Sequence, residues 1–434
     1  MADSSTSDWL RPAFQAVAID DEGRACRDIP ESACHQEAGN FFRHVGSLSL
    51  TKIADGLIDP KLVLSWLMLA LGAPAAMVGL LVPIREAGAL LPQLFTAGAL
   101  RRLSKRKWAW SIGSAVQGAA ALVIALIALF LEGQAAGFAI LAALAVLALA
   151  RSVCSVCYKD VLGKTVDKSR RGTATGLAGS IASGGVIVFA ALLASGLVDR
   201  FQLVVIAIIL AGAAWMLAAA LFSTLKEAPG ATEGGKAAFV AAMENLVWLK
   251  DDAQLRRFIL VRSLLTATAL APPFMIAAAS GAQDILPLGA LVLASALAGL
   301  LSAYVWGRLS DRSSRKVLVY AGLTGGLALA ISAALGLTGL LHPLYALPAM
   351  IFIIMIAYQG VRLGRSTHLT DMATAETRAA YTALSNTIVG IVILAGGFFS
   401  VLAAFAGVIA VLFLMSGMAV LAAILALGLD EVQA

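Results

Sequence analysis

The sequence predicts an all-α membrane protein with twelve transmembrane helices in two pseudo-symmetric six-helix bundles. Three observations predict this fold: an apolar composition, a series of long uncharged runs and an internal repeat. Apolar residues make up 60% of the 434 residues and charged residues only 13%, whereas soluble domains have about 45–50% and about 25%. Such a chain has too little polar surface to cover itself in water, so lipid is the solvent for most of it.

Uncharged segments of membrane-spanning length recur along the chain. A helix needs about 20 mostly apolar residues to cross the hydrocarbon core of a bilayer. The two longest runs each hold two such helices, and we expect them to divide at His342-Pro343 and near Gly396-Gly397. Runs without Lys, Arg, Asp or Glu cover residues 62–84, 108–131, 133–150, 172–198, 201–225, 263–283, 285–307, 317–361 and 379–429.

An internal repeat assigns the remaining helix. Residues 98–107 resemble residues 307–316, which lie 209 positions later, and the five residues from Arg171 resemble those from Arg378, 207 positions later. Two landmarks that agree within two residues indicate a chain of two similar halves. The repeat divides the run 62–84 into the end of helix 1, a turn at Gly72-Ala-Pro74 and the start of helix 2. The count is then twelve spans, six in each half.

Basic residues gather in every second loop, which predicts the orientation. The loops on one side of the membrane hold a single basic residue, Arg200. By the positive-inside rule, the other side and both termini face the cytoplasm, in a multi-pass protein of the cytoplasmic (inner) membrane. The loops on that side explain the net charge of +6 without nucleic acid as a partner, and they hold Arg101, Arg102, Lys105, Arg106, Lys107, Lys159, Lys164, Lys168, Arg170, Arg171, Arg308, Arg312, Arg315, Lys316, Arg362, Arg365 and Arg378.

The predicted organisation has five parts. Residues 1–45 form a cytoplasmic N-terminal segment, because they are rich in carboxylates and have no apolar core for a signal peptide. Two six-helix bundles, 46–225 and 257–429, flank a cytoplasmic linker at 226–256 with a short amphipathic helix, and residues 430–434 form a C-terminal tail. Cys26, Cys34, His35 and His44 match no standard zinc spacing, so no metal is expected.

One loop resembles a family signature. The pattern Gly307-x-Leu309-x-Asp311-Arg312-x-x-Arg315-Lys316 resembles the loop between the second and third helix of each half in the major facilitator superfamily (MFS) of transporters. The resemblance extends over residues 45–429 and implies the MFS fold, with a central cavity that opens alternately to either side. It also implies a cytoplasmic latch between the bundles when the cavity faces outward. The pseudo-symmetry of the halves makes Arg170 or Arg171 the expected partner of Asp311.

The chain departs from the family pattern in three places. In the second half, Ser314 stands where the family has glycine. In the first half, Arg102 stands at the aspartate position and Lys105 at the usual glycine position, so the corresponding latch is expected to be absent or weaker. In helix 5, Ser180 and Ile181 replace the Gly-Pro pair of the antiporter signature, which weakens the case for drug/proton antiport.

Ionisable residues cluster inside helices 1 and 2. Lys52, Asp55 and Asp59 share one helix face, and Pro60 removes a backbone hydrogen bond and is expected to break the helix beside them. Arg85 and Glu86 lie at a similar depth in helix 2, so we expect the pairs Asp59–Arg85 and Lys61–Glu86. Charges inside a membrane are costly and predict a functional site, with a structural ion-pair network as the alternative. The coupling candidates are Asp55, Asp59, Lys61, Arg85 and Glu86, and Asp59 is the expected proton-coupling group.

Polar residues in otherwise apolar spans are candidates to line the cavity. Arg151 and Arg262 lie nearer the cytoplasmic ends of their helices, where either an anionic substrate or simple snorkelling to the interface would explain them. The neutral candidates also fit a role as hydrogen-bonding contacts between helices. The full set is Gln117, Arg151, Arg262, Tyr358, Gln359 and Asn386, with Ser385 beside the last.

These features predict a secondary active, proton-coupled, alternating-access transporter of a small organic solute. The expected partners are that solute, a co-transported proton and the lipid bilayer, and the expected state is a monomer. The sequence has no nucleotide-binding loop and no hydrolase or dehydrogenase constellation, so neither a cofactor nor an enzymatic reaction is predicted. Two alternatives stay open: a non-transporting protein of this fold that acts as an assembly factor or sensor, and a lipid flippase.

Overall fold

The computed structural model describes residues 36–93, 100, 102–229, 247–279, 288–342, 344–374 and 377–433. Within these ranges the side chains at 168–169, 247–248, 303–304, 311 and 378–379 are not described. The predicted linker helix lies mostly outside the described residues, and so do Cys26, Cys34 and His35. His44, by contrast, is described: its Nε2 lies 2.7 Å from the Thr165 hydroxyl.

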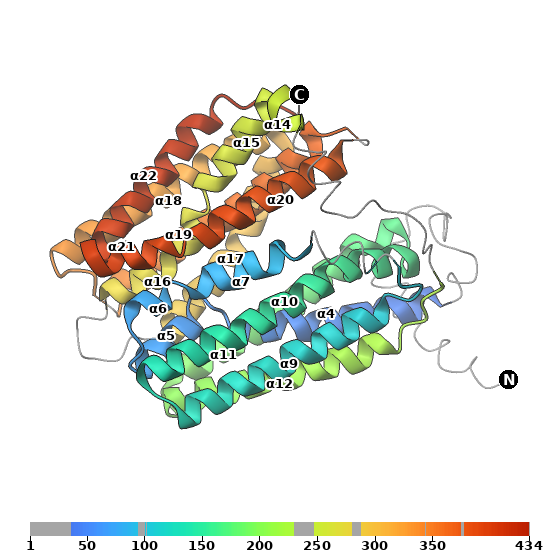
Figure 1. Cartoon of the computed structure of the whole chain (residues 1–434), viewed down its shortest axis with the longest axis horizontal. Helices are drawn as coiled ribbons and strands as arrows, with labels where there is room; N and C mark the ends of the chain where they lie inside the picture. The colour runs from blue at the N-terminus through green and yellow to red at the C-terminus, as the bar shows by residue number, and fades with distance from the viewer. Residues whose placement is uncertain are drawn as a thin grey trace.

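The regular elements of the described chain are helices in two bundles (Figure 1). The first bundle contains α4 (Glu37–Leu57), α5 (Val63–Ala70), α6 (Ala75–Val78), α7 (Leu81–Leu90), α9 (Lys107–Phe130), α10 (Gly133–Thr165), α11 (Lys168–Ser195) and α12 (Arg200–Ser223). The second bundle, which follows the short helix α14 (Val247–Asp251), contains α15 (Ala253–Leu264), α16 (Ala267–Ala279), α17 (Leu288–Arg312), α18 (Ser314–Leu337), α19 (Ala346–Met372), α20 (Arg378–Ala395), α21 (Phe398–Ala406) and α22 (Val408–Ala426).

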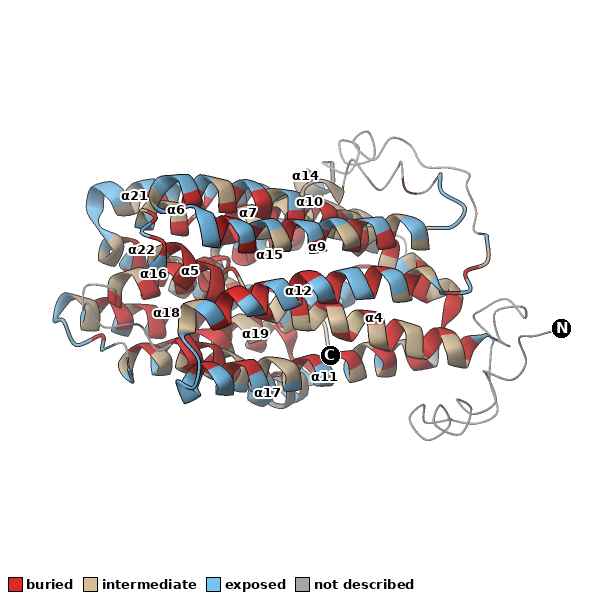
Figure 2. Cartoon of the chain, turned by 90° about the horizontal axis from the view of Figure 1, so that it is seen from below, coloured by how far each residue is buried: buried red, intermediate tan, exposed pale blue. Residues whose placement is uncertain are grey.

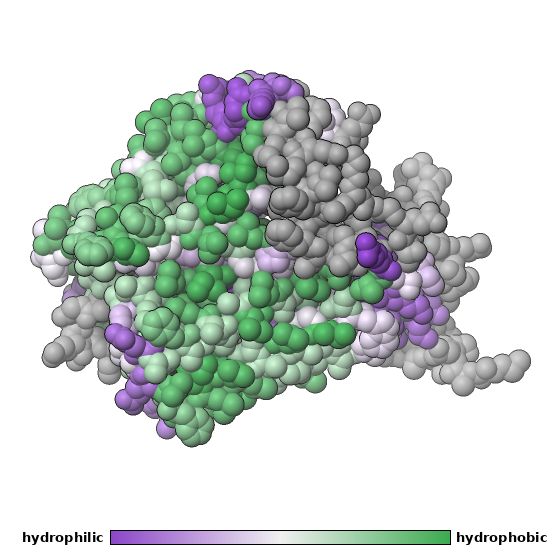
Figure 3. All heavy atoms as spheres, viewed as in Figure 1, coloured by the Kyte–Doolittle hydropathy of each residue, from purple (hydrophilic) through white to green (hydrophobic). Residues whose placement is uncertain are grey.

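The surface and the helix lengths are those of a multi-pass membrane protein. Nine helices among the described residues are long and apolar enough to cross a bilayer. Large apolar side chains such as Leu126 and Phe130 point outward, and apolar residues cover most of the coloured part of the face seen in Figure 3. Buried residues lie on the inner faces of the helices and exposed residues on the outer faces (Figure 2). The count of twelve spans stays a prediction, because several helices are broken into shorter pieces.

Helix 1 is broken where the sequence predicts it. The helix stops at Leu57 and restarts at Val63, with Pro60 between the two pieces. A second interruption separates α5 from α6 at residues 71–74, where Gly72 has a φ of 76°. A side chain is strained in that backbone region, so glycine suits this turn. The uncharged run 62–84 is therefore divided among several helices, which confirms the division predicted from the repeat.

The division of the last long run was predicted at the wrong glycines. Backbone hydrogen bonding continues through Gly396, whose N–H donates to the Val392 carbonyl at 2.9 Å. The chain turns instead at Gly407, whose φ is 84°. A pair of glycines weakens a helix, but only a residue in the left-handed region reverses the chain here. The Gly396-Gly397 pair is therefore a joint between α20 and α21 within one span-length segment.

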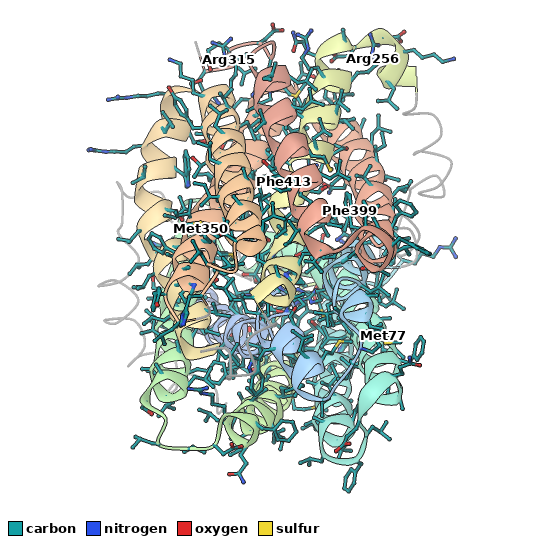
Figure 4. All side chains as sticks on the ribbon, turned by 90° about the vertical axis from the view of Figure 1, so that its left-hand side faces the viewer. Met77, Arg256, Arg315, Met350, Phe399 and Phe413 are labelled. Atoms are coloured by element: carbon teal, nitrogen blue, oxygen red, sulfur yellow. The ribbon has the colours of Figure 1, made fainter. Side chains whose placement is uncertain are left out.

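The two bundles pack most closely at the end remote from the basic loops. We name the end that carries residues 102–107, 159–171 and 308–316 the basic end, and the other the opposite end. At the opposite end, a Cβ on Gly289 of α17 would lie 2.5 Å from the Ala194 nitrogen of α11. Seen from that end, Met77 of α6 belongs to the first bundle and Phe399 of α21 to the second (Figure 4). Towards the basic end the bundles diverge (Figure 1), and Gly176 of α11 and Gly307 of α17 have no described atom within 4 Å of a built Cβ.

Candidate functional site

Asp59 occupies the break in helix 1. One of its carboxylate oxygens accepts hydrogen bonds from the backbone N–H groups of Lys61, at 2.8 Å, and Leu62, at 3.1 Å. These donors would otherwise be unsatisfied at the start of the second helical piece. The predicted pair between Asp59 and Arg85 does not form, because the side chain of Arg85 reaches Asp55 instead.

Asp55 joins three helices of the first bundle. Its carboxylate lies 2.8 Å from Arg85 of α7 and 2.6 Å from Arg151 of α10. Asp55 itself is on α4, one turn before the break. The ion pair turns Arg151 towards Asp55, so the snorkelling interpretation of Arg151 is wrong. A carboxylate between two guanidinium groups reduces the cost of burying all three charges.

Lys61 connects the first bundle to the second. Its ammonium group is buried and lies 3.7 Å from the Glu86 carboxylate, so the predicted Lys61–Glu86 pair is confirmed. The same nitrogen lies 3.3 Å from the Tyr358 hydroxyl and 4.4 Å from the centre of its ring. Because Tyr358 belongs to α19, this cation is in contact with both bundles.

Arg262 is buried in the second bundle and is held by neutral groups. Its guanidinium donates to the Ser385 hydroxyl at 2.6 Å and to the Asn386 side-chain oxygen at 2.7 Å. Only 6% of the residue is exposed, and its Nε has no hydrogen-bond partner among the described atoms. Snorkelling to the interface is therefore also wrong for Arg262. The hydrogen bonds of Arg262 join α15 to α20, and its guanidinium places a positive charge inside the protein.

A small cavity lies between the bundles at Arg262. We name it the arginine cavity; its volume is about 20 Å³. Arg262 lines it from α15, and Tyr358, Arg362 and Arg365 line it from α19. Glu86 of α7 is the carboxylate among its lining residues. Its other lining residues are Leu265, Thr266, Thr268, Ala269, Val361 and Ile393.

A larger cavity of about 220 Å³ lies in the wall of the first bundle. Gln117 lies at its lining, with its amide nitrogen 3.3 Å from the Cys154 sulfur and its amide oxygen buried without a partner among the described atoms. Arg151 also lines this cavity and so lies between it and Asp55. The full lining is Leu48, Thr51, Trp110, Gln117, Arg151, Cys154, Ser155, Tyr158 and Lys159.

The structure distributes the predicted site residues over this region and adds two. Gln359 accepts from Arg362 at 3.4 Å, beside the arginine cavity, and Asn386 bonds to Arg262. From the sequence, Arg362 and Arg365 are expected at a cytoplasmic turn. Their spacing from Tyr358, i+4 and i+7 on one helix, is the signal that would have placed all three on a common face.

The region has more positive than negative side chains. Its three carboxylates all have partners: Asp55 and Glu86 form ion pairs, and Asp59 accepts backbone hydrogen bonds. Among the described residues, Lys52, Arg262, Arg362 and Arg365 have no carboxylate within 4 Å, although Arg362 and Arg365 lie within electrostatic reach of Glu86. The cations of the cluster are Lys52, Lys61, Arg85, Arg151, Arg262, Arg362 and Arg365, and the described chain shows no group of three metal-ligating side chains.

The predicted latch is only partly within the described residues. The side chain of Asp311 lies outside them. Arg170 pairs with Glu37 at 2.9 Å, and Arg171 donates to the backbone carbonyls of Val166 and Gly163. The contact between Asp311 and either arginine therefore stays a prediction. Of the other latch residues, Arg315 pairs with Glu431 at 3.3 Å, Lys316 donates its backbone N–H to the Ser313 hydroxyl, and Arg312 ends α17.

Solved structures of transporters have the same fold. The nucleoside transporter NupG superposes with a TM-score of 0.69 over 90% of this chain and 100% of its own, at 14% identity. A POT family transporter in complex with 5-aminolevulinic acid gives 0.70 over 93% and 98%, at 9% identity. The xylose transporter XylE from E. coli, in an inward open conformation, gives 0.61 over 91% and 96%, at 12% identity. No protein-family model and no curated protein sequence matches the chain. The predicted MFS fold is confirmed.

Proposed function

We propose that the protein is a secondary transporter that moves a small organic solute across the cytoplasmic membrane by alternating access. The observation that carries the proposal is the cluster of charged side chains at the broken helix 1, where the two bundles meet. Broken helices and intramembrane charges mark solute and ion sites in transporters. The structural neighbours, which transport nucleosides, peptides or xylose, support the same class of function.

The positive-inside rule places the basic end in the cytoplasm. In that orientation the structure corresponds to an inward-facing state, because the bundles pack tightly at the opposite end and diverge at the basic end. The outward-facing state then requires the basic end to close, and the pairing of Asp311 with Arg170 or Arg171 is proposed to hold it closed. Arg170 would have to exchange its contact with Glu37 for this pairing.

Glu86 is the carboxylate best placed to couple a proton to this movement. Glu86 forms an ion pair with Lys61 and interacts electrostatically with Arg85, both of the first bundle. It also interacts electrostatically with Arg362 and Arg365 of the second bundle. The partners of Asp55 and Asp59 all belong to the first bundle. A carboxylate binds a proton more readily when fewer cations surround it. Movement of one bundle against the other therefore changes the proton affinity of Glu86 most, and we propose it in place of Asp59.

Transport by the purified protein in liposomes tests this proposal. Radiolabelled uridine, dialanine, xylose, glucose 6-phosphate and succinate are offered separately, with and without a proton gradient and a protonophore. We expect at least one solute to accumulate above the level in liposomes without the protein. We also expect this accumulation to be lost when the protonophore abolishes the proton gradient. Binding without translocation of any solute would instead favour a sensor or assembly factor.

Glu86→Gln is expected to abolish accumulation driven by the gradient and to retain downhill exchange of the same solute. A glutamine cannot exchange a proton, but it keeps nearly the same volume. The matched control is Glu132→Gln, which removes an exposed carboxylate before α10. Full gradient-driven accumulation by Glu86→Gln would show that this carboxylate is not the coupling group.

A further inference from the structure

We propose that the transported solute is a small organic anion whose phosphate or carboxylate groups bind to the arginines that line the arginine cavity, with Arg262 as the central contact. At about 20 Å³ the cavity has room for about one water molecule, so it must widen as the bundles move to admit the anion. This inference deepens the proposed function and rests on it, because it specifies the chemical class of the solute at the same site. Arg262 is buried, two further arginines of the second bundle line the same cavity, and cations of the first bundle lie opposite them. The carboxylate in the lining, Glu86, is paired with Lys61.

The charge of Arg262 is buried without a counter-ion among the described residues. The described side chains that bind it, Ser385 and Asn386, are neutral. Burying a guanidinium against neutral partners alone is unfavourable, since its desolvation is not compensated by an opposite charge. Its Nε–H, which is unpartnered among the described atoms, is available to an acceptor. A guanidinium with free N–H groups matches the paired oxygens of a carboxylate or phosphate.

Arg362 and Arg365 extend the positive charge along α19. Both line the cavity with Arg262, and the Arg362 guanidinium lies 5.8 Å from the Tyr358 ring centre. The carboxylate in the lining, Glu86, is already paired with Lys61. The second bundle therefore presents three arginines to the cavity and, among the described residues that line it, no carboxylate of its own. An anion with two negative charges, such as a phosphate monoester or a dicarboxylate, fits this excess.

Cations of the first bundle lie across from this wall. Lys52 of α4 is within electrostatic reach of both Arg362 and Arg151. Its ammonium group donates to the Thr175 carbonyl at 3.1 Å, which is again a neutral partner. Closing the basic end brings these like charges nearer to one another, which is unfavourable unless an anion lies between them. A neutral solute such as a sugar or nucleoside would add no negative charge to this group of cations, which Asp55 and Glu86 offset only in part.

Thermal stability of the detergent-purified protein tests the class of ligand without requiring transport. The probes are matched pairs of equal carbon skeleton: glucose 6-phosphate and glucose, glycerol 3-phosphate and glycerol, succinate and 1,4-butanediol. A ligand that binds only the folded state raises the melting temperature. We expect at least one anion to do so, its neutral counterpart to have no effect, and the shift to shrink as salt is added. Sodium sulfate at the same ionic strength is the control: it shows how much of the rise in melting temperature any divalent anion would cause.

Substitution of the arginines locates the site. Arg262→Gln is expected to weaken binding of the anion by about ten- to a hundredfold, the range for hydrogen bonds to a charged group. Arg365→Gln is expected to act in the same direction and serves as the second variant if Arg262→Gln does not fold. The matched control is Arg256→Gln, which removes an exposed arginine of the same helix (Figure 4). Its affinity is expected to equal that of the parent protein.

Two outcomes would overturn the inference. In the first, the neutral partner of a pair stabilises the protein as much as the anion. In the second, Arg262→Gln and Arg365→Gln both fold and bind the anion as tightly as the parent. Neither outcome is evidence for or against transport, because the liposome assay measures transport separately. Conversely, anion binding that depends on Arg262 in a protein that moves no solute would retain the site and refute the proposed function.

Discussion

At the scale of single residues, neighbouring carboxylates of one helix have different partners. Asp55 precedes the break and binds two arginines from other helices. Asp59, one turn after Asp55, lies in the break and binds the backbone of its own chain. The sequence predicts that both face the interior, since their spacing is helical. It does not predict the division of roles, because Asp59 lies outside the regular helix once Pro60 has broken it.

Asp59→Ala is expected to lower the stability of the protein by about 1 kcal/mol, the typical cost of removing a capping side chain. Asp59→Asn keeps a side-chain oxygen that accepts the same two N–H groups, so its melting temperature is expected to stay near that of the parent. The measurement is thermal unfolding in detergent, with gradient-driven transport assayed in parallel. Loss of coupling in a stable Asp59→Asn protein would restore Asp59 as the coupling group in place of Glu86.

At the scale of helices, close contact between α11 and α17 depends on a glycine. Gly289 lies against the backbone of Leu193 and Ala194, where a side chain has no room. Neither helix shows this from its own sequence, because the constraint arises from the neighbouring backbone. The approach of these helices keeps the two bundles together at the opposite end.

Gly289→Val is therefore expected to separate α11 from α17 and to favour the conformation that is open at the opposite end. The readout is labelling of a Gly176→Cys substitution near the basic end with a membrane-impermeant maleimide, after the four native cysteines are replaced by alanine. Labelling is expected to fall. The control is Gly417→Val on α22, where a built Cβ meets no described atom within 4 Å. Equal labelling of the Gly289→Val protein and its parent would mean that this contact does not hold the conformation.

At the scale of the whole molecule, the two bundles are joined by polar contacts at the level of the broken helix and by tight packing at the opposite end. A two-state movement about such contacts needs a compensating contact at the basic end. The loop at 307–316 is the proposed source of that contact. A solute or proton shifts the equilibrium only through its different affinity for the two states.

Asp311→Asn is expected to shift the population towards the inward-facing state by about 1–3 kcal/mol, the usual range of coupling between such sites. The same Gly176→Cys labelling measures this shift, and labelling is expected to rise. Asp430→Asn removes an exposed carboxylate of the C-terminal tail and is the matched control. If labelling is the same in both variants, Asp311 is not part of a latch.

The class of fold and most of the helical segments follow from the amino-acid sequence alone. The apolar runs, the repeat and Pro60 predicted the membrane helices, the turn at Gly72 and the break in helix 1, because these depend on local composition and backbone geometry. Which charged groups form pairs depends on the packing of the helices against one another. Asp55 forms an ion pair with Arg85, and Lys61 donates a hydrogen bond to Tyr358. Arg362 and Arg365 line a cavity with Arg262. Helical spacing fixes the face of a residue, but its partner depends on how neighbouring helices rotate and cross when their side chains pack.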